Sequence, residues 1–217
     1  FDRVGAEFVK DITPYETMKL RFLNAGHTMA AALGYLAGDH SIHEALGRPV
    51  IYNFVNLALL NNILPVTQIP EGTNGRTYIQ QVLGRFQNHT LPYAVLQVGT
   101  DSSQKIQQRW FPSIDDALNQ GSDTSFLAFA LAAWVRYIVA ASDRSELNDP
   151  LRNEFSELTQ HAVEMPVEAF LALAAADKFH FFNNPGFLGR VVEYYRAISS
   201  SGVKVALKRF LATESEK

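Results

Sequence analysis

Apolar residues recur at helical spacing along most of the chain, and short polar breaks separate the segments. The first such segment covers residues 14–37, and its apolar positions follow a period of three to four residues: Leu20, Leu23, Ala30, Leu33 and Leu36. Thr13, Pro14 and Glu16 resemble a capping box with a proline in the first turn. Gly38 suits the end of a helix. The pattern therefore predicts one long helix over residues 14–37.

Similar patterns predict further helices, with a short helical segment opening at Ser41 between the first two. The predicted ranges are 49–62, 77–86, 104–110, 112–121, 124–141, 150–163, 166–175, 185–200 and 202–211. Residues 93–98 form the one apolar run that could be a strand. The polar tail over residues 213–217 is predicted to fray. The sum is an all-α chain in which residues 1–217 form a single domain.

Composition narrows the class of protein. The 217 residues carry 47% apolar and 19% charged residues, which is typical of a globular fold. A net charge of −3 gives no electrostatic basis for binding nucleic acid or an anionic membrane. The chain has no cysteine, which excludes disulfides, thiolate catalysis and Cys-type zinc sites and fits a cytoplasmic protein.

Neither the charged N-terminal segment nor the longest apolar run gives a targeting or membrane signal. The charged first eleven residues lack the pattern of a signal peptide. The start at Phe1 rather than Met suggests either that the chain was cut from something longer or that a tag or start was removed. The longest apolar run, Phe126 to Ala141, contains Arg136 and is short for a membrane span, so we expect a buried core helix.

Several weaker motifs are better explained without chemistry. Gly72 to Gly75 is glycine-rich, but no strand precedes it, and no G-x-G-x-x-G fingerprint follows a strand anywhere in the chain. His40, His43 and Glu44 are metal-ligand types without partners at zinc spacing, so a surface turn is favoured and no metal is expected. His180 stands among phenylalanines, which favours a core or domain-interface position.

The most informative stretch places Lys19, Asn24 and His27 on the first predicted helix. At about 100° per residue, Lys19 and His27 lie about 80° apart and Asn24 and His27 about 60° apart. All three fall within a face of about 140° over roughly 12 Å of helix axis, beside which a small molecule could lie. The alternative is a core helix whose lysine extends to solvent and whose amide and imidazole have ordinary structural partners.

The pattern Lys19-x-x-x-Leu23-Asn24-x-x-His27 resembles the polyol-specific long-chain dehydrogenase family, which contains mannitol 2-dehydrogenase and fructuronate reductase (mannonate oxidoreductase). The stretch from Asp101 to Lys105, followed by Arg109, is similar to the family's Asp-Gly-Ser-x-Lys segment. The resemblance implies a multi-helical C-terminal substrate domain like that of 6-phosphogluconate-dehydrogenase-type enzymes. It also implies a partner N-terminal nucleotide-binding domain that is absent from this chain, and NAD as cofactor with NADP not excluded.

The same resemblance implies roles for individual residues. Lys19 would be the general base and acid, Asn24 an oxyanion donor and His27 a ligand of a substrate hydroxyl, without a metal. These residue types suit the oxidation of a secondary alcohol, in which hydride leaves carbon and a proton leaves oxygen. A lysine can take that proton when burial lowers its pKa, and Arg21 would act in the same direction if it lay close. An asparagine amide can hold the developing alkoxide.

Two positions bear on the substrate, which is expected to be a small sugar acid or polyol. Gln97 stands where polyol-oxidising members tend to have arginine, and Ser102 where the segment often has glycine. Lys105 and Arg109 are four residues apart and could bind a substrate carboxylate, or they could simply form a solvated basic face. We expect a keto-uronate/aldonate pair, such as fructuronate and mannonate, in preference to mannitol and fructose.

A helical interaction module without chemistry is the competing hypothesis. It gains if Asn24 and His27 are sealed in the core, whereas the enzyme gains if they converge with Lys19 on an accessible cleft.

Overall fold

The computed structural model describes residues 8–161 and 167–216. Within these ranges all the regular elements are helices, joined by turns and loops, and the only β-type pairing is an isolated antiparallel bridge between Ser41 and Ala94. The all-α prediction is therefore confirmed.

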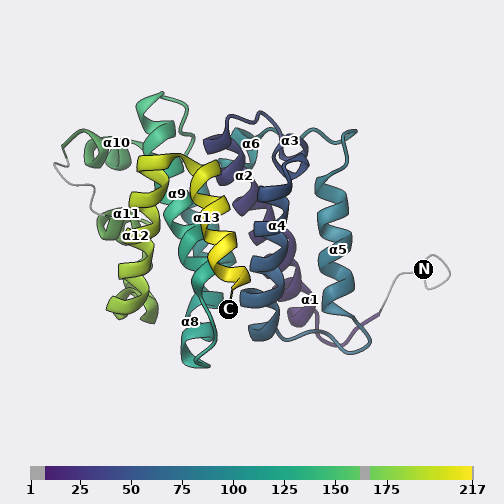
Figure 1. Ribbon diagram of the computed structural model, residues 1–217. Helices are drawn as coiled ribbons and strands as arrows, with labels where there is room; N and C mark the ends of the chain where they lie inside the picture. The colour runs from purple at the N-terminus through teal and green to yellow at the C-terminus, as the bar shows by residue number, and fades with distance from the viewer. Residues whose placement is uncertain (1–7, 162–166, 217) are drawn as a thin grey trace.

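The helices follow one another with short connections (Figure 1). They are α1 (Thr13–Met18), η2 (Lys19–Asn24), α2 (Ala25–Ala37), α3 (Ile42–Gly47), α4 (Pro49–Leu57), η3 (Ala58–Ile63), η4 (Leu64–Val66), α5 (Gly75–Phe86), α6 (Val95–Gly99), α7 (Ser102–Arg109), α8 (Phe111–Asn119), α9 (Ser125–Asp143), α10 (Arg152–His161), α11 (Val167–Leu173), η5 (Ala176–Lys178), η6 (His180–Asn183), α12 (Pro185–Ser201) and α13 (Val203–Ser215).

Two helices organise the packing. The long α9 runs beside α12, α10 and α2, and its side chains are buried over almost its whole length. The helix α2 packs against α3, α4, α6 and α9, so it crosses the middle of the molecule (Figure 1). By length and composition alone, Ser125–Asp143 and Pro49–Val66 are apolar enough to cross a membrane, but a buried core helix passes the same test. The burial of α9 matches the predicted core helix.

An aromatic cluster fills the space between α4, α9, α12 and α13. Its members are Phe54, Phe126, Phe129, Tyr194 and Phe210. The ring of Phe210 lies 4.9 Å from that of Phe126, 4.9 Å from that of Phe129 and 5.4 Å from that of Tyr194. Tilted and edge-to-face pairs at such distances add to the free energy gained by burying the rings.

Three local predictions were wrong. Residues 93–98 are not a strand: α6 begins at Val95, because within the described chain no second strand exists to pair with this run, and a helix buries both Val95 and Val98. Thr13 does not cap the first helix, because it already lies within α1, and its backbone N–H donates to the Asp11 carboxylate at 2.9 Å. The C-terminal tail does not fray at Thr213, since α13 continues to Ser215.

The other predicted helices match within a few residues at their ends. Gly38 has the left-handed conformation expected of a helix end, with φ +85°, and Ser41 caps α3 by accepting from the Glu44 backbone N–H. The predicted ends at residues 163 and 166 lie outside the described residues.

Candidate active site

The first long helix carries the candidate residues, and its winding changes where they lie. The elements α1, η2 and α2 form one continuous helix, but the stretch from Lys19 to Asn24 is π-helical. In an α-helix Lys19 and Asn24 would point about 140° apart. A π-helix closes its hydrogen bonds between residues i and i+5 and has more residues per turn than an α-helix, so residues five apart lie much closer to one face. The π-helical turn therefore brings Lys19 and Asn24 to the same face.

The small residues that follow are explained by packing. A Cβ atom on Gly26 would come within 3.2 Å of Leu59 and 3.3 Å of Phe86, and one on Gly34 within 2.7 Å of Ala45. These glycines let α2 approach η3, α5 and α3 closely, which offsets their unfavourable helix propensity. The same close packing brings Phe86 against α2, where its ring stacks on His27.

His27 lies between two aromatic rings. It stacks on Phe86 with ring centroids 4.7 Å apart, and the ring of Tyr93 meets it edge-on at 5.6 Å. Its Nε2 is buried and has no hydrogen-bond partner among the described residues. Burial lowers the pKa of His27 to about 4, with smaller contributions from the charges of Arg109 and Lys105. The imidazole is therefore neutral at physiological pH and has an unused polar atom, as a ligand for a hydroxyl group requires.

Lys19 and Asn24 differ in their exposure. Lys19 is exposed, so the described chain does not supply the burial that the base was expected to have, whereas Asn24 is half-buried. Arg21 does not approach Lys19: its guanidinium donates to the Val66 carbonyl and pairs with Asp116. Residues two apart point to different faces of a helix, which explains this divergence.

A buried carboxylate fixes the start of α7. Asp149 accepts hydrogen bonds from the backbone N–H of Ser103 at 2.9 Å and from both the Ser102 and Ser103 hydroxyls. The Ser102 hydroxyl also accepts from the indole of the buried Trp134 at 3.1 Å. Ser102 therefore has a role here that a glycine could not fill. Asp101, with φ +52°, turns the chain into the helix.

Helix α7 brings the predicted cations to His27. Lys105 and Arg109 are half-buried, and both lower the pKa of His27. Burial, followed by the charge of Arg109, also lowers the pKa of Lys105, whose ammonium donates to the Val98 carbonyl at 3.3 Å. The pair is thus not the solvated basic face that was the alternative. Gln97 is exposed on α6, which is the helix that also supplies the Val98 carbonyl.

Arg109 has partners on the long helix that sequence reasoning missed. Its Nη1 donates to the Thr28 hydroxyl at 2.7 Å and to the Asn24 carbonyl at 3.3 Å. The neighbouring Trp110 donates from its indole to the Ala25 carbonyl at 3.3 Å. No helical periodicity signals such contacts, because they join residues about 85 positions apart in the chain.

The remaining motifs form no competing centre. Among residues 8–161 and 167–216, no group of three or more His, Cys, Asp or Glu side chains could hold a metal ion. Glu44 accepts from the His40 backbone N–H, and His43 contacts the Gln87 carbonyl. His180 is exposed, so the core position among its two predicted positions is wrong, and the domain-interface position stays a prediction. Its backbone N–H donates to the Asp115 carboxylate, and the neighbouring Phe181 is the residue that is buried.

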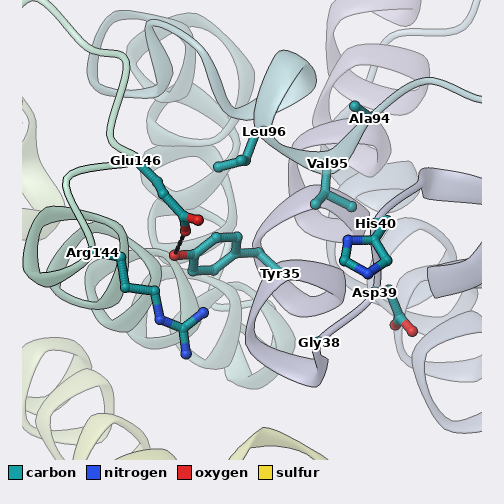
Figure 2. Close-up of a pocket in the computed structure, with 9 residues that line it drawn as sticks. All are labelled: Tyr35, Gly38, Asp39, His40, Ala94, Val95, Leu96, Arg144 and Glu146. Atoms are coloured by element: carbon teal, nitrogen blue, oxygen red, sulfur yellow. Dashed lines mark hydrogen bonds between the residues drawn. The ribbon is translucent and has the colours of Figure 1, made fainter.

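A cavity of about 320 Å³ lies near the other end of α2. Figure 2 shows Tyr35 at its centre, with its hydroxyl donating to Glu146 at 2.6 Å and the guanidinium of Arg144 beside its ring. Burial, with the hydrogen bond to Glu146, raises the pKa of Tyr35 to about 12. These groups satisfy one another, which marks them as structural.

The sequence is similar to known proteins over most of its length. The family model described as "Mannitol dehydrogenase C-terminal domain" matches residues 11–199. The chain is 31% identical to D-mannonate oxidoreductase of Escherichia coli (strain K12), over 94% of this chain and 43% of that protein. It is 28% identical to mannitol 2-dehydrogenase of Pyricularia oryzae, over 97% of this chain and 43% of that protein. The chain thus spans less than half the length of these curated relatives.

A solved structure of a mannitol 2-dehydrogenase has a similar fold over this part of its chain. The ternary complex of Pseudomonas fluorescens mannitol 2-dehydrogenase with NAD and D-mannitol superposes with a TM-score of 0.83 at 26% identity, covering 97% of this chain and 43% of that one.

Proposed function

Because the chain belongs to the mannitol dehydrogenase C-terminal domain family, we propose that it is the substrate-binding and catalytic part of an NAD-dependent oxidoreductase acting on a sugar acid or polyol. The observation that supports this proposal most is the π-helical winding over Lys19–Asn24, which by helix geometry turns the two residues towards one face. His27, three residues further on, has a buried Nε2 without a partner among the described residues. A partner nucleotide-binding domain outside this chain would hold the cofactor, NAD or NADP, in the cytoplasm.

The residues divide the work of oxidising a secondary alcohol. NAD, when bound, accepts the hydride from the substrate carbon. The Lys19 amine takes the proton from the hydroxyl, and the Asn24 amide donates to the oxygen as negative charge develops there. His27 offers its neutral imidazole to a neighbouring hydroxyl of the substrate. No step in this scheme uses a metal.

Lys19 needs a neutral amine to act as the base. In the described chain its side chain is exposed. A second domain closing over this face would exclude water, and exclusion of water favours the uncharged form of a lysine. Tyr93, which is 47% exposed beside His27, lies where such a domain would make contact.

We further propose that the substrate carries a carboxylate, as in the fructuronate and mannonate pair. Lys105 and Arg109 are half-buried on α7, and Arg109 donates to the Asn24 carbonyl, so a substrate beside Asn24 would have these cations near it. Gln97 adds a neutral amide on α6 rather than a further charge. A charge-assisted hydrogen bond contributes about 1.5–3 kcal/mol, which corresponds to roughly 10- to 100-fold discrimination between acid and alcohol.

The test is a direct comparison of kcat/KM for mannonate and mannitol, measured on the full-length enzyme with NAD. We expect the aldonate to be preferred. A clear preference for mannitol that Lys105→Met leaves unchanged would contradict the carboxylate assignment and leave the Lys19 chemistry intact. The absence of NAD-dependent turnover of either substrate class would contradict the proposed function itself.

A further inference from the structure

Two carbonyl groups at the end of the π-helical turn from Lys19 to Asn24 accept hydrogen bonds from side chains at the end of another helix. Arg109 donates to the Asn24 carbonyl, and Trp110 donates to that of Ala25. Both donors stand at the end of α7, and Trp110 is fully buried. Thr28 completes the set, since its hydroxyl accepts from Arg109 at 2.7 Å and donates to the Asn24 carbonyl at 3.1 Å.

Such a turn needs support, because π-helical segments are rare and occur mostly as single insertions within α-helices. A helix that relaxed to the α form would shift the register by one residue and return Lys19 and Asn24 to about 140° apart. A π-helical winding in place of the commoner α-helical one persists only where its surroundings favour it. The side-chain donors of α7 meet the helix at the junction between η2 and α2, which is the point where the register is set.

We propose that Arg109 and Trp110 are positioning residues, which hold the π-helical turn and thereby keep Lys19 aligned with Asn24. This inference rests on the proposed function of those two residues. It gives Arg109 a second role beside any contact with a substrate carboxylate, and the two roles differ in their kinetic signature. Loss of a ligand for the substrate raises KM for the charged substrate only, whereas misalignment of the base lowers kcat for every substrate.

The experiment uses the full-length enzyme and the variants Arg109→Ala, Arg109→Lys and Trp110→Phe. We expect Arg109→Ala to lower kcat by about 10- to 100-fold on both an aldonate and an uncharged polyol, since a displacement of about 1 Å can cost that much. The polyol KM should stay near the wild-type value. Arg109→Lys should recover part of the rate because it keeps one donor, and Trp110→Phe should lower kcat by roughly 3- to 10-fold by the same effect.

Arg190→Ala is the matched control. Arg190 is also half-buried and donates to a threonine hydroxyl, that of Thr124, at 2.7 Å, but it joins α12 to α9. This variant should keep the wild-type kcat. Hydrogen exchange gives a readout that does not depend on activity: the backbone amides of residues 20–25 should exchange faster in Arg109→Ala and at the wild-type rate in Arg190→Ala.

Two results would overturn the inference. One is a defect of Arg109→Ala confined to a raised KM for the aldonate, with unchanged exchange over residues 20–25. The other is an equal loss of kcat in Arg190→Ala, which would indicate general destabilisation. Lys19→Ala, measured alongside, separates the catalytic role of Lys19 from the positioning role of Arg109 and Trp110. If it is inactive while the Arg109 and Trp110 variants keep their kcat, only the positioning role fails. If Lys19→Ala is fully active, the catalytic role of Lys19 fails and the positioning role fails with it. The proposed function fails only if the wild-type enzyme turns over neither substrate class with NAD.

Discussion

The aromatic cluster around α9 and the helix from Lys19 to His27 differ in how regularly they are wound and packed. In the cluster, Phe54, Phe126 and Phe129 are buried against rings from α12 and α13, and α9 is a regular helix with few polar groups along it. The long first helix instead departs from α-helical winding, exposes Lys19 and leaves His27 Nε2 buried without a partner in the part of the chain that the structure describes. Departures from ideal packing gather where a protein binds and reacts, so the contrast separates the source of stability from the source of chemistry.

The largest effect on stability should come from the aromatic cluster. Phe129→Ala removes a ring that is 1% exposed and should lower the free energy of unfolding by about 3–5 kcal/mol. Phe8→Ala, at a ring that is 81% exposed, is the control and should change it by less than about 0.5 kcal/mol. Denaturant unfolding measures both. Equal effects of the two variants would show that the cluster is not the main store of stability.

Asn24→Ala should show the reverse pattern. Removing one oxyanion donor should lower kcat of the full-length enzyme by about 10²-fold or more. The free energy of unfolding should change little, because the fold uses the Asn24 backbone carbonyl, which the substitution retains. Steady-state kinetics and denaturant unfolding on the same sample separate the two quantities. Wild-type kcat, or a loss of stability that accounts for the lost rate, would remove Asn24 from the chemistry.

Lys105→Met tests whether Lys105 recognises a carboxylate on the substrate. It should lower kcat/KM for an aldonate by roughly 10- to 100-fold and affect an uncharged polyol much less, because one charge-assisted hydrogen bond is lost. Lys204→Met, at an exposed lysine on α13, is the matched control and should leave both values unchanged. An equal loss on both substrates would place Lys105 outside carboxylate recognition.

The smallest effect concerns the pH dependence of stability. With a pKa of about 4 in the folded chain and about 6.5 when unfolded, His27 binds a proton only in the unfolded state between these values. Stability is therefore present above about pH 6.5 and falls as the pH drops towards 4. Allowing for the partial exposure of the ring, the loss is about 1–2 kcal/mol.

The measurement is the free energy of unfolding between pH 7 and 4.5. His27→Gln should reduce the slope in this range, whereas His180→Gln, at an exposed imidazole, should keep the wild-type slope. An unchanged slope in His27→Gln would contradict the assignment of this proton to His27.

The sequence predicted the regular half of the molecule better than the site. Helical periodicity found α9 and the first long helix because each buries a repeating face, and Gly38 marked a helix end through its left-handed backbone. It failed at residues 93–98, because a largely apolar run of six residues fits a strand and a short helix equally well and only the tertiary partners decide.

At the site, residue types were informative and geometry was not. The spacing of Lys19, Asn24 and His27 placed them on a broad face of one helix, but helix propensities contain no signal for a π-helical turn. The contacts of Arg109 with Thr28 and of Asp149 with Ser103 join distant parts of the chain, so local pattern could not reveal them. The exposure of Lys19 in this chain was equally invisible to local pattern, which led us to expect a buried base.

The most direct test of the account is the kcat of Lys19→Ala in the full-length enzyme at neutral pH. General acid–base catalysis is typically worth 10²- to 10⁴-fold, so we expect a loss of that size with unchanged affinity for NAD. The free energy of unfolding of this chain alone should not change, because the Lys19 side chain is exposed in it. Added small amines should restore part of the rate. Retention of more than about half of the wild-type kcat would contradict the account, because general acid–base catalysis by Lys19 would then be worth less than about twofold.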